Sequence, residues 1–126
     1  MNWKRICREH QYDILAGEIM ELQKIIYRAM DLRRQSEVKE TNLYGSPSTI
    51  MDIAQGFAGD VNNLVKIIEA EQGQRQIANS KEKLEAHLAH CLWSVVVLSQ
   101  MHNVNLETAF MEAMDRLENH LLETQE

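Results

Sequence analysis

The chain has 126 residues, which is enough for one domain, although a core of this size is thin. Hydrophobic residues make up 44% and charged residues 25% of the chain, which is ordinary for a globular protein. The single proline and five glycines argue against a β-rich fold with long loops. The net charge of −6 argues against a nucleic-acid backbone as the main partner.

The cysteines and the apolar runs set the expected compartment. Cys7 and Cys91 lie far apart in unlike contexts, so a disulfide framework is not expected and a reducing cytosol fits better. Cys91 begins the longest apolar run, residues 91–98, which is far too short to span a bilayer. The first five residues lack the apolar stretch of a signal peptide. We therefore expect a cytoplasmic protein whose partners include neither a membrane nor a nucleic acid.

The first predicted helix runs from about residue 13 to residue 38. Its polar face is basic, and its apolar residues recur at spacings of three and four, which is typical of an amphipathic helix. These apolar residues are Ile19, Leu22, Ile26 and Ala29, with Ile25 and Leu32 widening the stripe. Residues 42–47, which include the only proline, are expected to break the helix. Residues 1–12 either extend it or fray, and the sequence leaves both open.

The second predicted helix starts at Thr49 or at the residue before it and ends at Gly73. Thr49 and Asp52, three residues apart, resemble a capping box, and Gly73 is a natural stop. Gly56 and Gly59 fall inside this helix, where each costs roughly 1 kcal/mol relative to alanine. Either close helix packing or a ligand that approaches the backbone is expected to offset this cost, and packing is the favoured interpretation.

The third predicted helix opens near Asn79, with Glu82 placed to cap back onto it, and continues to Met101. Residues 91–98 are apolar nearly all round, which predicts burial on several sides. In a chain this short, such burial indicates a subunit interface.

The fourth predicted helix is capped by Asn105, and residues 122–126 are expected to fray. Its inner stripe consists of Leu106, Ala109, Phe110, Ala113, Met114 and Leu117. The four helices predict an all-α fold, a four-helix bundle completed by dimerisation. Residues 1–126 form a single domain in this prediction, with residues 1–39 as its N-terminal helix.

Four polar residues interrupt the helix faces in pairs. Asp60 and Asn63 share a face of the second helix, and His87 and His90 share a face of the third, because residues three apart are neighbours on a helix. If the two helices pack together, four groups with hydrogen-bonding or metal-ligand capacity converge between them. The alternative is that the histidines are solvated and that Asp60 and Asn63 merely end a polar face. Spacing alone favours this alternative.

Five segments between about residues 40 and 118 form a recognisable series: 44–47 (YGSP), 55–61 (QGFAGDV), 64–66 (LVK), 88–95 (LAHCLWSV) and 103–110 (NVNLETAF). In their order and spacing these segments together resemble the MazG-like nucleotide pyrophosphohydrolases. The last segment looks like the entry to the final helix in that family, G-[IV]-D-L-E-x-A-F.

The resemblance implies an all-α, MazG-like fold that is usually dimeric or tetrameric, so the expected partner is the chain itself, as a homodimer or homotetramer. It also implies an enzyme that cuts NTPs or dNTPs into NMP and pyrophosphate. Enzymes of this family use Mg²⁺ held by carboxylates. These belong to an E-E-x-x-E or G-D-x-x-D motif on one helix and an E-x-x-D motif on the next.

Carried over by position, the first motif falls on Gly59, Asp60 and Asn63, and the second falls on His87 and His90. Only Asp60 keeps its acid. Asn63 stands where the family has a carboxylate, His87 stands where it has Glu, and His90 stands where it has Asp. These four residues, Asp60 with Asn63, His87 and His90, are the predicted metal-site positions.

The resemblance also places Lys66 and Arg75 at basic positions, which makes them the predicted substrate-binding residues. A second registration uses Glu18 and Glu21 as the first acidic motif and the segment around Asp60 as the second. We prefer the first registration because it accounts for the third and fourth helices in order. Glu18 and Glu21 are then expected to be solvated charges on the first helix.

The three replaced carboxylates have a chemical consequence. Mg²⁺ prefers oxygen ligands, so the ordinary Mg²⁺ mechanism is expected to be badly impaired. Imidazole suits Zn²⁺ and other transition metals, so the site is expected to hold either such a metal or none. Three hypotheses remain: an NTP or dNTP pyrophosphohydrolase with an altered site, an inactive nucleotide-binding or regulatory protein, and a plain helical dimerisation module. No catalytic residue is assigned.

Overall fold

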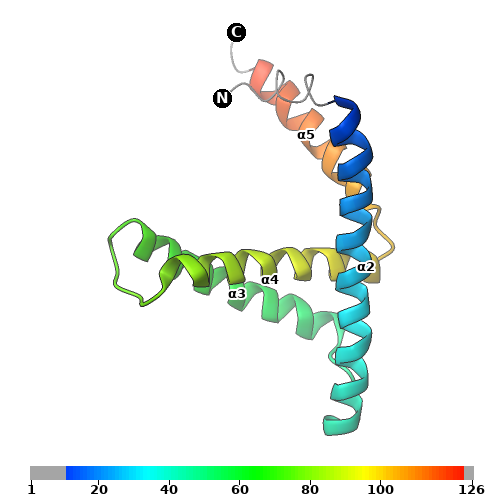
Figure 1. Cartoon of the computed structure of the whole chain (residues 1–126), viewed down its shortest axis with the longest axis vertical. Coiled ribbons are helices and arrows are strands. Elements are labelled where there is room, and N and C mark those ends of the chain that lie inside the picture. Colours follow the sequence, from blue (N-terminus) through cyan, green and yellow to red (C-terminus); the bar gives the residue numbers. More distant parts are fainter. Residues whose placement is uncertain (1–10, 124–126) are drawn as a thin grey trace. The chain divides into compact units, whose positions relative to one another are not determined.

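The computed structural model describes residues 11–123, with side chains from residue 21 onward. No strand occurs in this part of the chain, so the predicted all-α class is confirmed (Figure 1). The helices are α2 (Gln11–Tyr44), α3 (Ile50–Glu71), α4 (Ser80–Met101) and α5 (Leu106–Glu123). The chain divides into two compact units, Met1–Pro47 and Ser48–Glu126, which are treated separately below. The single domain and the bundle completed by dimerisation stay predictions.

Helix α2 continues six residues beyond the predicted end at Val38, so that prediction was wrong. Residues 39–44 contain neither glycine nor proline, and ion pairs on the helix surface favour its continuation. Arg33 Nε lies 2.9 Å from Glu37 Oε1, and Arg33 Nη1 lies 3.8 Å from Glu40 Oε2. The helix ends where Gly45 adopts a φ of +86° and its N–H donates to the Thr41 carbonyl at 2.9 Å.

The predicted ends of α3 are confirmed. Thr49 is the N-cap: its Oγ1 accepts from the Asp52 N–H at 3.1 Å, while the Thr49 N–H donates to Asp52 Oδ2 at 2.9 Å. At the other end, Gly73 has a φ of +78°, and the Gln74 N–H donates to the Glu69 carbonyl at 2.9 Å. Glycine adopts this left-handed conformation without strain, which is why the helix stops here.

Helix α4 begins differently from the prediction. Asn79 has a left-handed backbone, with φ 55° and ψ 41°, and makes no side-chain capping bond, so the capping pair of Asn79 with Glu82 was wrong. Side-chain caps require an extended N-cap residue, which Asn79 is not. The hydroxyl of Ser80 instead donates to Glu71 Oε1 at 3.0 Å, a bond that joins the start of α4 to the end of α3.

The turn between α4 and α5 matches the prediction. Asn103 takes a positive φ of 56°, and the Val104 N–H donates to the Ser99 carbonyl at 2.8 Å. Asn105 Oδ1 then accepts from the Thr108 N–H at 3.1 Å, which confirms the predicted cap of α5. Helix α5 continues to Glu123, so the predicted fraying at residue 122 was wrong, and residues 124–126 lie outside the described part.

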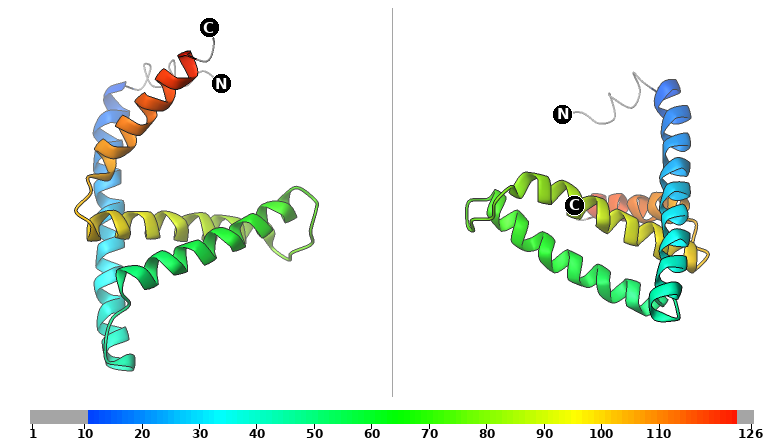
Figure 2. Two further views of the ribbon diagram at one scale, coloured as in Figure 1. Left: turned by 180° about the vertical axis from the view of Figure 1, so that it is seen from behind. Right: turned by 60° about the horizontal axis from the view of Figure 1, so that its bottom comes forward.

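Helices α3 and α4 pack against one another as an antiparallel hairpin, which two views show (Figures 1 and 2). Within this unit the buried apolar side chains are Ile53 and Ile67 of α3 and Val96 and Val97 of α4. Val96 and Val97 are 0% exposed in the single chain.

The capping box yields the first prediction. Thr49→Ala is expected to lower the free energy of unfolding by about 1 kcal/mol, because the Asp52 N–H loses its side-chain acceptor. Urea unfolding measures this change. Thr41→Ala is the control, since Thr41 only donates back to the Glu37 carbonyl inside an exposed helix, and it should cost little.

The same capping box predicts that the free energy of unfolding decreases at acidic pH. The backbone N–H of Thr49, and then its hydroxyl, lower the pKa of Asp52 below its ordinary value of 3.8. Because the folded pKa is depressed, the stabilisation is fully present above pH 3.8 and is lost as the pH falls through the folded pKa. The loss should be smaller in Asp52→Asn. If the free energy of unfolding falls equally with pH in the parent and in Asp52→Asn, the capping box does not stabilise the helix as described.

Candidate functional site

Asp60 and His87 lie on the faces through which α3 and α4 pack. On each helix a set of buried or half-buried residues recurs at alternating spacings of three and four, as at the seam of a coiled coil, although Val96, Val97 and Ser99 of α4 are buried outside this set. On α3 these residues are Ile53, Phe57, Asp60, Leu64 and Ile67. On α4 they are Ser80, Leu84, His87, Cys91, Ser94, Leu98 and Met101. Asp60 and His87 are half-buried members of this seam.

The bond between Ser80 and Glu71 fixes the register of the two helices. Counted outward from that bond at about 1.5 Å per residue, Asp60 lies roughly 16 Å along α3 and Cys91 lies at the same level of α4. By the same count, Leu64 of α3 lies level with His87 of α4. By this count the segment around Asp60 is level with the segment that contains His87 and His90, and the convergence of the four side chains stays a prediction.

Asn63 and His90 are exposed, and each precedes a seam residue by one position. In an antiparallel pair, residues at this position on the two helices border the same edge of the seam. We call this edge the polar flank. It consists of Gly56, Gly59, Asn63 and Lys66 on α3 and of Lys83 and His90 on α4. The four predicted metal-site positions thus share one edge of the hairpin, two on the seam and two beside it.

The opposite edge of the hairpin is chemically different. In the middle of the hairpin the residues that follow the seam positions are apolar on both helices, whereas Lys81 and Glu85 hold such positions near the start of α4. We call this edge the apolar flank; it consists of Val61, Val65 and Ile68 on α3 and of Leu88, Leu92 and Val95 on α4. Five of these six side chains are 39–50% exposed.

The two histidines of the site have defined relations. His87 Nδ1–H donates to the Lys83 carbonyl at 2.9 Å, which leaves the Nε2 lone pair of a neutral ring available to a ligand. The ring centroids of His87 and His90 lie 6.3 Å apart with a tilt of 49°. His87 is therefore held by its own helix, while His90 extends from the edge.

No group of three or more His, Cys, Asp and Glu side chains arranged to hold a metal occurs among the described residues. The metal site of Asp60, Asn63, His87 and His90 stays a prediction. Its donors are one carboxylate, one amide and two imidazoles, a set that suits a transition metal better than Mg²⁺.

The predicted substrate-binding residues lie in different places. Lys66 is exposed on the polar flank. Arg75 lies in the segment between α3 and α4, where its Nε donates to Glu69 Oε2 at 3.1 Å. Glu18 and Glu21 form the first acidic motif of the registration that we rejected. Glu21 is exposed on α2, and the side chain of Glu18 lies outside the described part.

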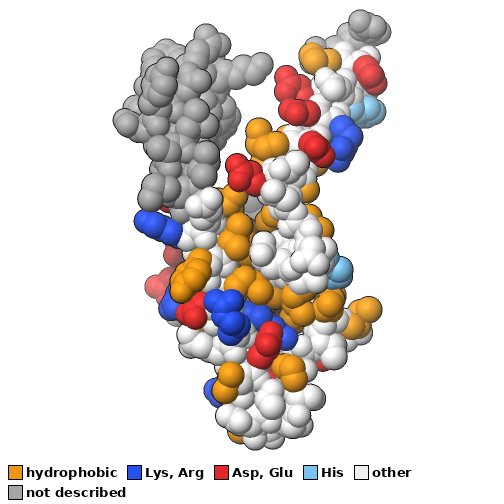
Figure 3. All heavy atoms as spheres, turned by 90° about the vertical axis from the view of Figure 1, so that its right-hand side faces the viewer, with side chains coloured by type: hydrophobic (Ala, Val, Ile, Leu, Met, Phe, Trp, Pro, Cys, Tyr) orange, Lys and Arg blue, Asp and Glu red, His pale blue; other side chains and the backbone are white. Residues whose placement is uncertain are grey.

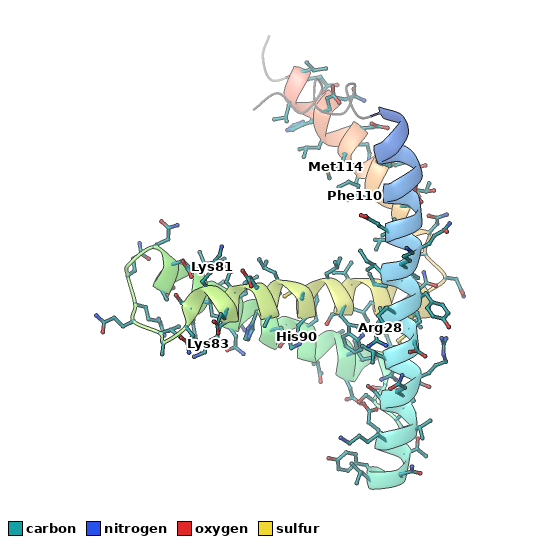
Figure 4. The ribbon with its side chains drawn as sticks, in the orientation of Figure 1. Arg28, Lys81, Lys83, His90, Phe110 and Met114 are labelled. Atoms are coloured by element: carbon teal, nitrogen blue, oxygen red, sulfur yellow. The ribbon has the colours of Figure 1, made fainter. Side chains whose placement is uncertain are left out.

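Sequence reasoning missed Lys83. This exposed lysine lies on the polar flank seven residues before His90, at the equivalent position one heptad earlier, whereas Lys81 lies on the other side of α4 (Figure 4). The heptad spacing between Lys83 and His90 was the available signal. This spacing places the two residues on one edge of the hairpin only when the seam of α4 is known.

Gly56 and Gly59 do not mark close helix packing, so the favoured interpretation was wrong within the described chain. A Cβ added at either glycine meets nothing within 4 Å. The backbone of α3 is therefore accessible along the polar flank at these two positions, which leaves a ligand or a second chain as the reason for the glycines.

Comparison with protein families, curated proteins and solved structures finds no match for this chain. None of the helices between residues 11 and 123 is both long and apolar enough to cross a lipid bilayer.

The open glycines give the second prediction. Gly59→Ala is expected to raise the free energy of unfolding by roughly 0.5–1 kcal/mol, because alanine is the better helix former and its methyl group meets no neighbour. Chemical denaturation measures this gain. Gly73→Ala serves as the opposite control, since its φ of +78° strains any residue with a Cβ and should lower stability.

Proposed function

We propose that this chain is a divergent MazG-like protein that binds a nucleoside triphosphate, NTP or dNTP, on the polar flank. In this proposal it descends from nucleotide pyrophosphohydrolases and has lost ordinary Mg²⁺-dependent hydrolysis to NMP and pyrophosphate. The observation that carries the proposal is the hairpin itself. The hairpin supports it, because a count from the bond between Ser80 and Glu71 puts the segment of Asp60 and Asn63 at a level similar to that of His87 and His90, and Lys66 is exposed one turn further along α3.

The chemistry of this edge favours binding over hydrolysis. Hydrolysis in such enzymes needs carboxylates that hold Mg²⁺ and an activated water. The proposed site has one carboxylate, Asp60, with two imidazoles and an amide, so too little negative charge is present to hold Mg²⁺ beside a triphosphate. Lys66 can still donate hydrogen bonds to phosphate oxygens, and so can a ring N–H of His90.

The direct test combines binding and turnover on the full chain. Thermal-shift and calorimetric titrations with ATP, GTP, CTP, UTP and the four dNTPs should show binding of at least one of them. Pyrophosphate release with Mg²⁺ should stay at background. Release with Zn²⁺ or Mn²⁺ but not Mg²⁺ would indicate instead a pyrophosphohydrolase with an altered metal. No response to any nucleotide or metal would overturn the proposal.

Restoring the missing carboxylates gives the third prediction. The triple variant Asn63→Asp, His87→Glu, His90→Asp is expected to bind Mg²⁺, measured by calorimetry, where the parent does not. The matched control replaces Asn63→Asp by Asn62→Asp, which adds the same charge at an exposed position one residue away. Equal Mg²⁺ binding by both triple variants would mean that net charge, not this edge, attracts the ion.

We also propose that the chain pairs with a second copy through the apolar flank, as a homodimer that can double to a homotetramer. The flank's exposed side chains form one continuous edge of the hairpin, and burying each contributes about 1 kcal/mol. Phe110 and Met114, one turn apart on α5, are likewise 57% and 40% exposed (Figure 4). Hydrophobic side chains are spread over the surface in Figure 3. A plain dimerisation module is the second candidate function, and these exposed side chains favour it.

Self-association gives the fourth prediction. The parent should sediment as a dimer or larger, and Leu88→Arg should shift it toward the monomer by placing an unpaired charge in the interface. Ala86→Arg is the control, because it adds the same charge at an exposed position away from the apolar flank. A monomeric parent, or a Leu88→Arg variant that sediments like the parent, would contradict this interface.

A further inference from the structure

Helix α5 presents an apolar stripe that its own unit leaves largely exposed. None of the side chains between residues 106 and 123 is buried. Phe110, Met114 and Leu117 are 57%, 40% and 49% exposed, and their spacing of four and then three residues places them on one face of the helix. Most of the stability of a helix in a protein comes from the packing of its apolar face. Helix α5 therefore requires a packing partner.

The apolar flank carries the same spacing on both of its helices. On α3 and on α4 alike, its three residues are separated by four and then three positions. This is the spacing of a seam between helices, so the flank is suited to receive a third helix. Counted from the bond between Ser80 and Glu71, the flank extends over about 18 Å, from Ile68 to Val95. Helix α5 has 18 residues and a length of about 27 Å, so it can span the flank.

The turn between α4 and α5 directs α5 away from the hairpin of its own chain. The Val104 N–H donates to the Ser99 carbonyl at 2.8 Å and Asn105 caps α5, so hydrogen bonds fix this turn. Within the unit Ser48–Glu126, α3 and α4 pack extensively on one another, whereas α5 runs away from them (Figures 1 and 2). The stripe of α5 and the apolar flank thus stay apart within one chain, and a second copy can supply each with the other.

We infer that α5 of one copy lies on the apolar flank of a second copy, and that the second copy returns the same contact. This inference rests on the proposed self-association through the apolar flank and names the element that covers the flank. A two-fold axis relates the two contacts, so the assembly closes as a dimer.

The number of apolar side chains that become covered favours this arrangement. If two apolar flanks met one another, each copy would bury six apolar side chains and the stripe of α5 would remain exposed. In the reciprocal arrangement each copy buries the same six and the three of α5. Stable interfaces use about 20–30 residues from each partner, with an apolar centre and a polar rim. The larger apolar set is closer to what such an interface needs.

Two substitutions on α5 provide a matched pair for the test. Leu117→Arg places a charge in the stripe, and Asn119→Arg places the same charge on the far side of the helix, because two residues correspond to about 200° of rotation. Sedimentation of the full chain measures the dissociation constant of the dimer, and circular dichroism checks that both variants stay helical. Leu117→Arg is expected to raise this constant at least tenfold, and Asn119→Arg less than about twofold.

A photochemical cross-link tests the contact in a chain whose interface keeps its apolar character. Benzoylphenylalanine, a photoreactive amino acid of similar shape, is introduced in place of Phe110. This chain is mixed with parent chain labelled with a heavy nitrogen isotope, and the cross-linked peptides are identified by mass spectrometry. Position 110 of the unlabelled chain is expected to join to labelled peptides that contain residues 61–68 or 88–95.

The outcomes separate this inference from the proposed self-association. Cross-links that form only within one chain, or only from α5 to α5, would overturn the reciprocal contact. If Leu88→Arg dissociates the dimer while Leu117→Arg sediments like the parent, α5 lies outside the interface, and self-association through the apolar flank stands. If the parent itself is monomeric, both proposals fail.

Discussion

The register of the α3–α4 hairpin is the constraint on which the rest of the site depends. Seam residues of the two helices alternate at spacings of three and four, and the bond between Ser80 and Glu71 sets where the alternation starts on α4. A shift of one residue along either helix would rotate its seam positions by about 100° and take Asp60 or His87 off the seam. The site is therefore a property of the packing, and neither helix carries it alone.

The same register divides the hairpin into two edges with different chemistry. One edge presents glycines, an amide, lysines and an imidazole, and the other presents valines, leucines and an isoleucine. Branched apolar side chains that remain about half exposed favour burial against another protein surface. Bare backbone and cations favour a small anionic ligand. Binding of a ligand and self-association can thus occur on one hairpin without competing for the same surface.

Sequence alone predicted the features that depend on neighbours within about four residues. The caps at Thr49 and Asn105 and the stop at Gly73 are such features, and all three are confirmed. The end of α2 was missed because the apolar spacing does not include the ion pairs of Arg33. The cap at Asn79 was wrong because a left-handed backbone at the N-cap depends on how the chain turns between two packed helices.

The candidate site was predictable only in part, because it depends on packing between helices as well as on neighbours within four residues. Spacing identified the pairs on each helix, and the resemblance joined them, but which residues border them depends on the helix across the seam. That Lys83 borders the same edge as Lys66 and His90 follows only once the seam of α4 is known. The open backbone at Gly56 and Gly59 likewise depends on what the neighbouring helix leaves uncovered.

In the proposed site, the positions without carboxylates and the positive charge of Lys66 both favour the binding of phosphate groups. In a carboxylate-rich site, a triphosphate is repelled unless a divalent ion lies between the two sets of negative charge. In the proposed site an amide and two imidazoles stand at three of those positions, which removes that repulsion, and Lys66 attracts the phosphates directly. In this proposal the metal is not necessary for binding, although it supplies the activated water that hydrolysis requires. Nucleotide binding and nucleotide hydrolysis, coupled by one ion in the family that this chain resembles, are thereby separated in the proposed site.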